Sequence, residues 1–129
     1  AGGATAARTT FADKRLYDPI DDDDKASIRP DFAALIYTAD LTVAKHSEVM
    51  SEGFDVTEET PPIFFAHACD DEITTMGCVG LFAELQRHNV PSSLHIFSAG
   101  GHGFGGRATS QEKDSWLPLF RAWLNDRGF

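Results

Sequence analysis

Residues 61–71 read PPIFFAHACDD and carry a proline pair, an apolar run and an acidic loop in direct succession. Prolines restrict the backbone before them, so the pair ends whatever element precedes it. Ile63–His67 is rich in residues that favour strands, and we predict a buried β-strand over it. Two carboxylates, Asp70 and Asp71, follow where that strand ends.

The same alternation of strand and helix extends on both sides of this segment. Short apolar runs at Phe32–Tyr37 and Leu94–Phe97 predict two more buried strands. Met76–His88 has apolar residues at helical spacing, and so has a final segment from Ser110, in which Pro118 predicts a kink or a later start. Strands that alternate with helices indicate a parallel sheet, so we predict an α/β fold.

The remaining segments are less regular. Residues 10–30 are predicted to form mostly a loop, in which the acidic run at residues 21–24 is a solvated surface. We predict a short helix near Val43–Met50 in an otherwise irregular segment. Ala1–Ala7 is dense in small residues, which suits a helix start that passes close to other backbone.

Composition narrows the class of protein. The 129 residues amount to at most one domain, and with 42% hydrophobic residues they can build one core. The net charge is −9 and Lys and Arg form no cluster, which excludes nucleic acid and anionic membrane surfaces as partners. Cys69 and Cys78 lack histidines at zinc-site spacing, so we expect no metal there. We expect the two cysteines to be reduced, with a single disulfide between them as the alternative. We expect a soluble protein, and the cysteine count leaves secreted and periplasmic locations open.

A histidine in a glycine-rich loop follows the third predicted strand. Residues 98–106 read SAGGHGFGG, and the glycines let His102 project from a tight turn. In parallel sheets, functional sites lie beyond the carboxyl ends of the strands. An acid after one strand and a histidine after the next match the acid and base of a Ser–acid–His triad, although each is also common in ordinary turns and exposed loops.

The third member of such a triad is a serine in the pattern G-x-S-x-G, and the sequence contains no complete copy. Ser98 has the following glycine, but Ile96 stands where the first glycine is required. Cys69 is a weak alternative nucleophile, because no oxyanion motif follows it. The opening Ala1–Gly3 is similar to the residues that follow a nucleophilic serine, so we expect that serine immediately upstream of residue 1.

Together, these motifs resemble the α/β-hydrolase superfamily, and most closely its acetyl-esterase and acetyl-xylan-esterase-like branch, which includes dienelactone-hydrolase-like esterases. Ala1–Gly3 resembles the end of the G-x-S-A-G-G elbow, and Arg29–Tyr37 resembles the strand after the elbow helix. Residues 61–71 resemble the strand and loop of the catalytic acid, and Gly100–Gly105 resembles the histidine loop. The resemblance covers nearly the whole chain and is weakest over residues 38–60.

The resemblance implies that residues 1–129 are the C-terminal half of an α/β-hydrolase domain, with a mainly parallel sheet flanked by helices. It assigns the catalytic acid to Asp71, with Asp70 as the alternative, and the general base to His102. It assigns one oxyanion-hole donor to the backbone N–H of Ala1. Phe104 follows the base and is our candidate for the acyl pocket, with plain core packing as the alternative. No metal or organic cofactor is required.

We therefore expect a serine ester hydrolase for short-chain esters, such as sugar acetyl esters, completed by a segment upstream of residue 1. One alternative is an inactive α/β module that binds a ligand or a partner. Another is a subunit that pairs with its missing N-terminal half or with a second copy through an exposed sheet edge. Of the other histidines, we expect His67 and His95 to be structural, and His46 and His88 to lie on the surface.

Overall fold

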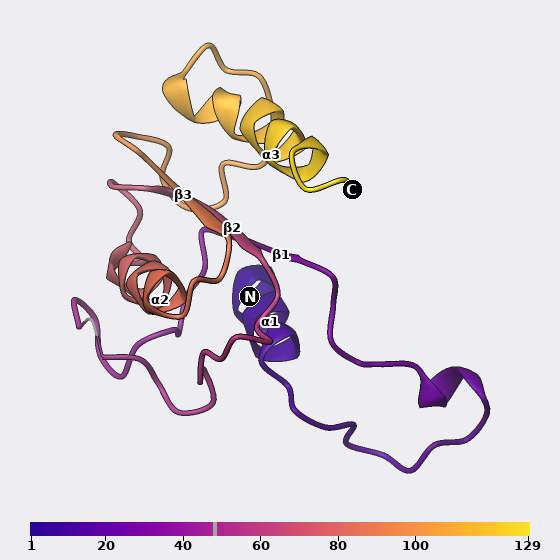
Figure 1. Ribbon diagram of the computed structural model, residues 1–129. Helices are drawn as coiled ribbons and strands as arrows, with labels where there is room; N and C mark the ends of the chain where they lie inside the picture. The colour runs from indigo at the N-terminus through magenta and orange to yellow at the C-terminus, as the bar shows by residue number, and fades with distance from the viewer. Residues whose placement is uncertain (48) are drawn as a thin grey trace.

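The computed structural model describes residues 1–47 and 49–129. Within them, helices, strands and short 3-10 turns follow each other along the chain (Figure 1). In chain order they are α1 (Gly2–Thr10), η1 (Asp23–Lys25), β1 (Ala33–Ile36), β2 (Ile63–Ala68), α2 (Met76–Arg87), β3 (Ser92–Phe97), η2 (Glu112–Ser115) and α3 (Trp116–Asn125).

The three strands form a parallel sheet with β2 at its centre, in the order β1-β2-β3. Ala33 pairs with Ile63, and Ile63 pairs with Ser92, so the strands begin level and their carboxyl ends meet at one edge. Every residue of β2 is buried, as expected for a parallel strand that is covered on both faces. The predicted α/β fold with a parallel sheet is confirmed.

Helices cover both faces of the sheet, with α1 and α2 on one side and α3 on the other (Figure 1). The side chains of β2 alternate between these two layers. Phe65 packs in the cluster that includes residues of α1 and α2, whereas Phe64 packs against Trp123 of α3. The same alternation places His67 on the α2 side, where it meets Cys78.

The start of α1 lies close against the end of β1, as the density of small residues predicted. A Cβ atom on Gly3 would come within 2.5 Å of Thr38 Oγ1 and 3.0 Å of the Ile36 carbonyl oxygen. Only glycine fits at such a distance from backbone. The N-terminal end of α1 is therefore held at the carboxyl edge of the sheet.

The last helix begins later than Ser110, in agreement with the second of the two options that Pro118 predicted. Because α3 begins at Trp116, Pro118 lies in its first turn, where a backbone N–H has no partner within the helix. The residues just before α3 form the 3-10 turn η2 instead.

The short helix predicted near Val43–Met50 is wrong over the part that the structure describes. Thr42 and Met50 form an isolated antiparallel bridge instead. His46 has φ +63°, a left-handed conformation that interrupts a right-handed helix. Turn formation therefore outweighs the weak helical pattern of this segment.

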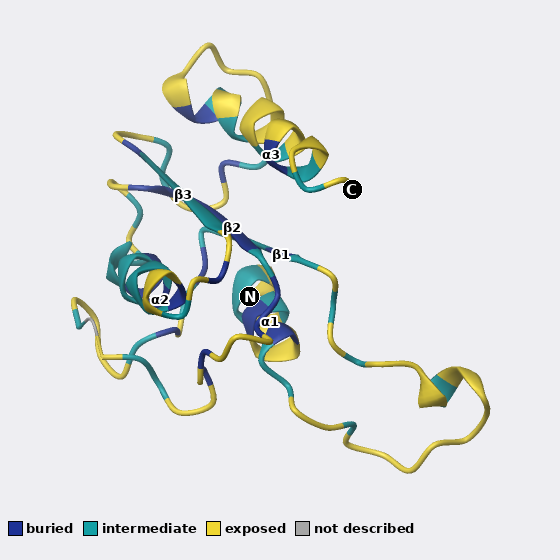
Figure 2. Cartoon of the chain, in the orientation of Figure 1, coloured by how far each residue is buried: buried dark blue, intermediate teal, exposed yellow. Residues whose placement is uncertain are grey.

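The acidic run lies between α1 and β1, and residues 21–23 are exposed as predicted (Figure 2). Asp24 is half-buried and pairs with Arg15 instead. Both cysteines are free, as predicted, with Cys69 exposed and Cys78 buried.

Among the described residues β1 and β3 are the outer strands, and association through a sheet edge stays a prediction. In the same part of the chain, no helix combines the length and apolarity needed to cross a bilayer.

Candidate active site

Asp71 and His102 come from the loops that follow the adjacent strands β2 and β3, at the carboxyl edge of the sheet. His102 Nδ1 donates to Asp71 Oδ2 at 2.9 Å, and Asp71 Oδ1 lies 3.2 Å from the same nitrogen. The Asp71 side chain is fully buried, whereas 37% of the His102 side chain is exposed. The structure thus brings the predicted acid and base into contact and leaves part of the imidazole accessible.

Hydrogen bonds hold Asp71 in its ionised form. Burial by itself raises the pKa of the Asp71 carboxyl, but hydrogen bonds from the Ile73 N–H and from His102 outweigh it and leave the pKa below its ordinary value. The Ile73 N–H donates to Oδ1 at 2.8 Å. A carboxylate beside His102 stabilises the imidazolium that forms when the histidine takes up a proton.

Asp70, the alternative acid, contacts the backbone of the histidine loop. Its Oδ1 accepts hydrogen bonds from the N–H groups of Gly100 and Gly101, each at 2.8 Å. Gly101 has φ +62°, a conformation that most other residues adopt only with strain. Asp70 therefore ties the two loops together, while Asp71 is the one of the two aspartates that contacts His102.

A buried lysine supports the histidine loop from η2. A Cβ atom on Gly100 would come within 2.9 Å of the Lys113 Cδ atom, so the loop lies directly on the lysine stem. The Lys113 ammonium donates to Thr109 Oγ1 at 2.7 Å and to Asp114 Oδ1 at 2.9 Å. The hydrogen bond from Lys113 holds the pKa of Asp114 well below its usual range. These charge-assisted bonds hold the Lys113 ammonium against residues 109–114, which keeps its stem in place under the loop.

Aromatic residues adjoin His102. The Tyr37 ring lies edge-on to the imidazole with 5.2 Å between ring centroids, and it contacts Phe104 with 4.9 Å between centroids. Tyr37 has φ +41° directly after β1, and such strained conformations cluster at active sites. Phe104 is only 8% exposed and also packs against Phe97 and Trp116. It supports the histidine loop from the core side, and its contact with substrate stays a prediction.

Ser98 and Ala1 are the candidates for an alternative nucleophile and for an oxyanion donor. The Ser98 hydroxyl donates to Glu112 Oε2 at 3.0 Å and not to His102. Among the described residues, none forms a hydrogen bond with the outer ring nitrogen of His102, Nε2. Ala1 is the exposed N-cap of α1, at the same edge of the sheet, and the role of its N–H stays a prediction.

The sequence reasoning missed the contact between His67 and the acid. His67 is fully buried in β2, and its Nε2 lies 3.1 Å from Asp71 Oδ2. Its other ring nitrogen lies 3.4 Å from Cys78 Sγ. The spacing of four residues between His67 and Asp71 was the available signal, and a histidine inside a strand is usually explained by packing alone.

We expect the free energy of unfolding to fall as the pH drops from about 7 to 5. Burial lowers the pKa of His67 below its ordinary value of 6.5, against the opposing charge of Asp71, and burial also lowers the pKa of His95. In this window the unfolded chain binds protons that the folded chain does not, so stability is lost as the pH falls.

Urea unfolding at a series of pH values measures this slope. His67→Leu is expected to reduce the slope of the free energy of unfolding against pH by at most about 1.4 kcal/mol per pH unit. The reason is that unfolding of the variant takes up at most one proton fewer per molecule. Equal slopes in the wild type and the variant would contradict the assignment of a buried neutral histidine at position 67.

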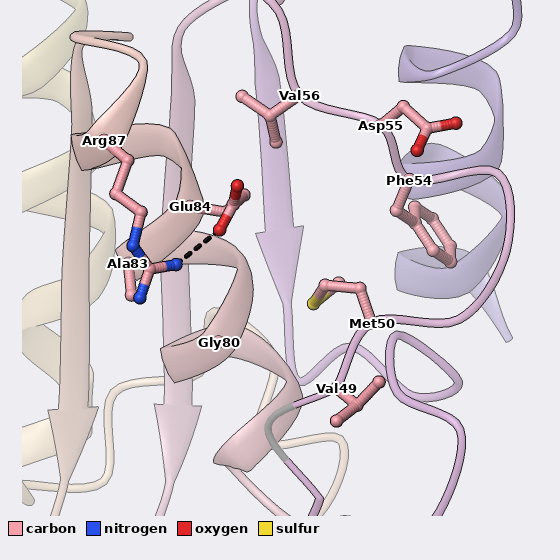
Figure 3. A pocket seen from close by; sticks show the side chains of 9 residues that line it. All are labelled: Val49, Met50, Phe54, Asp55, Val56, Gly80, Ala83, Glu84 and Arg87. Atoms are coloured by element: carbon pink, nitrogen blue, oxygen red, sulfur yellow. Dashed lines mark hydrogen bonds and ion pairs between the residues drawn. The ribbon is translucent and has the colours of Figure 1, made fainter.

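A groove elsewhere on the molecule lies between α2 and the segment that precedes Thr57 (Figure 3). Its lining consists of Val49, Met50, Phe54, Asp55, Val56, Gly80, Ala83, Glu84 and Arg87. The two charges on α2, Glu84 and Arg87, pair with each other. The groove shares no residue with the Asp71–His102 pair. Elsewhere too, the described residues contain no group of three His, Cys, Asp or Glu side chains that could hold a metal ion.

Comparisons with known proteins agree with this architecture. The model of the prolyl oligopeptidase family matches residues 9–127. A comparison with curated proteins found no match. The acetyl ester-xyloside bifunctional hydrolase from Caldicellulosiruptor lactoaceticus has 26% sequence identity and a TM-score of 0.80, and the match covers 100% of this chain and 54% of that chain.

Two further solved structures have the same fold at lower identity. A thermophilic esterase from Thermogutta terrifontis, Est2, has 20% identity and a TM-score of 0.77 over 99% of this chain and 53% of that chain. The carboxylesterase Cest-2923 from Lactobacillus plantarum has 19% identity and a TM-score of 0.60 over 76% and 45%. The chain thus spans about half the length of the structures it matches.

The predicted α/β-hydrolase resemblance is confirmed by these matches. The family model extends over both loops of the Asp71–His102 pair and over all three strands. The protein therefore belongs to the prolyl oligopeptidase family.

Proposed function

We propose that this chain supplies the acid and the base of a serine ester hydrolase. The observation that carries the proposal is the bond from His102 Nδ1 to Asp71 Oδ2, at 2.9 Å, in a pair whose acid is buried and whose base is partly exposed. A base held in this way takes up a proton through Nε2.

The proposed reaction is acyl transfer to water. A serine upstream of residue 1 attacks the ester carbonyl, and its hydroxyl proton passes to His102 Nε2. The tetrahedral intermediate collapses, and the alcohol leaves with the proton that His102 returns. Water then repeats the sequence on the acyl-enzyme, with His102 again as base and then as acid. Asp71 orients the imidazole and stabilises its protonated form throughout.

The position of α1 supports the placement of this serine. Gly3 lies against Ile36 and Thr38, which flank Tyr37, the neighbour of His102. A residue just before α1 is therefore at the edge of the sheet where His102 projects. The Ala1 N–H, at the start of the helix, is the proposed oxyanion donor, and each such donor contributes about 3 kcal/mol to lowering the barrier.

For the substrate we propose short-chain esters, sugar acetyl esters among them. The support is the likeness to the acetyl ester-xyloside bifunctional hydrolase from Caldicellulosiruptor lactoaceticus. Within this chain, Phe104 is the candidate for contact with the acyl group.

A chromogenic ester assay tests the proposal. A form of the protein that extends upstream of Ala1 through the serine is expected to hydrolyse p-nitrophenyl acetate much faster than the palmitate ester. A fluorophosphonate probe is expected to label that serine, and mass spectrometry locates the adduct. Residues 1–129 alone are the control and are expected to hydrolyse neither ester.

Absence of both hydrolysis and labelling in the extended form would favour the inactive α/β module instead. An adduct on Ser98 or Cys69 would contradict the proposed position of the nucleophile while leaving a hydrolase in place.

A further inference from the structure

A chain of polar contacts runs from His102 into the core. His102 Nδ1 bonds to Asp71 Oδ2 at 2.9 Å, and the same oxygen lies 3.1 Å from His67 Nε2. On the far side of the ring, His67 Nδ1 lies 3.4 Å from Cys78 Sγ. Asp71, His67 and Cys78 are all fully buried along this path.

The proton positions in this chain follow from the chemistry of its members. An ionised carboxylate only accepts hydrogen bonds, so both histidines must present an N–H to Asp71. For His67 this requires the proton on Nε2. A neutral His67 then has an unprotonated Nδ1, which needs a donor in a site that water does not reach.

The Cys78 thiol is that donor. Burial raises the pKa of the thiol to about 12, so the sulfur keeps its proton. With Sγ 3.4 Å from His67 Nδ1, the S–H points toward that nitrogen, which carries no proton of its own. A doubly protonated His67 would instead set two N–H donors against one carboxylate and one thiol.

The charges around His67 fit the neutral form. Asp71 faces it from the acid loop, Cys78 from α2 and His102 from the histidine loop. Burial opposes a charge on His67 most strongly, and His102 opposes it as well. Asp71 and the backbone of Ile73 favour the charge, and the net pKa of His67 is lowered.

We propose that His67 is a positioning residue that holds Asp71 through the same oxygen that accepts from His102, and that the Cys78 thiol fixes the tautomer in which His67 can do so. The proposal rests on the proposed function for its effect on hydrolysis. The hydrogen-bond chain itself exists whether or not the protein is an esterase.

The arrangement fixes the Asp71 carboxylate from three directions. Ile73 N–H donates to Oδ1, and His67 and His102 donate to Oδ2. Without His67, the carboxylate keeps one backbone bond and one bond to the base it must orient. Its rotation would then move His102, and loss of a hydrogen bond to a charged group lowers the rate by about 10- to 100-fold.

The first test needs no substrate. Nitrogen-15 NMR of the histidine side chains is expected to show His67 as the neutral Nε2–H tautomer at neutral pH. Cys78→Ala removes the donor to Nδ1 and is expected to give a mixture of tautomers. Cys78→Ser keeps a donor at that place and is expected to keep the single tautomer. A wild-type His67 that carries its proton on Nδ1, or that is charged at neutral pH, would overturn the proposal.

The second test addresses positioning. His67→Leu removes the donor to Asp71, and His67→Gln restores it, because a glutamine amide reaches the place of Nε2. The His102 Nδ1–H proton resonance is expected at low field in the wild type and in His67→Gln, and to broaden or move upfield in His67→Leu. In the form of the protein that extends upstream of Ala1, kcat for ester hydrolysis is expected to fall about 10- to 100-fold in His67→Leu at nearly constant KM. His67→Gln is expected to restore kcat.

The outcomes separate the two proposals. A folded His67→Leu protein with an unchanged His102 resonance and unchanged kcat would overturn the positioning role. Should no form of the protein hydrolyse esters, the proposed function fails, and the tautomer of His67 and the His102 resonance still decide the inference. If the His67→Leu variant does not fold, the inference is decided by the tautomers in Cys78→Ala and Cys78→Ser and by the His102 resonance in His67→Gln.

Discussion

We expect His102→Ala to lower kcat for ester hydrolysis by about 10⁵- to 10⁶-fold, with little change in KM. His102 is the partly exposed imidazole at this site, and Asp71 holds its Nδ1 so that Nε2 is left to exchange protons. Without His102, the proposed nucleophilic serine has no group to take its proton, and the leaving alcohol has no group to supply one. The residual rate then comes from binding and the oxyanion donors alone.

The measurement is steady-state hydrolysis of p-nitrophenyl acetate by the form of the protein that extends upstream of Ala1. Far-UV circular dichroism verifies the fold. His88→Ala is the matched control, because His88 lies in the C-cap of α2 and pairs with Glu84, outside the site. It is expected to keep wild-type kcat. A loss below about a hundredfold in His102→Ala would be too small for a general base and would contradict the assignment.

The strands and the two loops of the site were predictable because their signals are local. The apolar run at residues 63–67 is buried on both faces, and the predicted run at Phe32–Tyr37 is β1 with one residue added at each end. The glycines around His102 mark a tight turn, and Gly101 and Gly103 do have positive φ. Parallel pairing then places the acid and histidine loops at one edge without further information.

Features that depend on tertiary contact were not predictable. The sequence left Asp70 and Asp71 as alternatives, and only the turn after β2 directs one toward His102 and the other toward the loop backbone. His67 was expected to be structural, since burial in a strand explains most such histidines. Its contact with Asp71 arises because the chain reverses at the end of β2 and returns the carboxylate to the strand's last residues.

Asp71→Asn is expected to lower kcat by about 10⁴-fold. In the wild type, Oδ1 accepts from the Ile73 N–H, and Oδ2 accepts from His67 and His102. An asparagine has one oxygen for these two positions, so its NH₂ group faces an N–H donor in either orientation. With the oxygen kept on Ile73, His102 must move its proton to Nε2 to avoid the clash. The imidazole then presents a donor to the serine and cannot act as its base.

Asp70→Asn is the matched control, one residue away in the same loop. Asp70 uses a single oxygen, Oδ1, to accept from the Gly100 and Gly101 N–H groups, and asparagine keeps that oxygen. Its kcat is therefore expected to stay close to the wild-type value. The pair of variants tests which aspartate is the acid: a large loss in Asp70→Asn with little loss in Asp71→Asn would reverse the assignment. Nitrogen-15 NMR adds a reading without substrate, because His102 in Asp71→Asn is expected to change from the Nδ1–H to the Nε2–H tautomer.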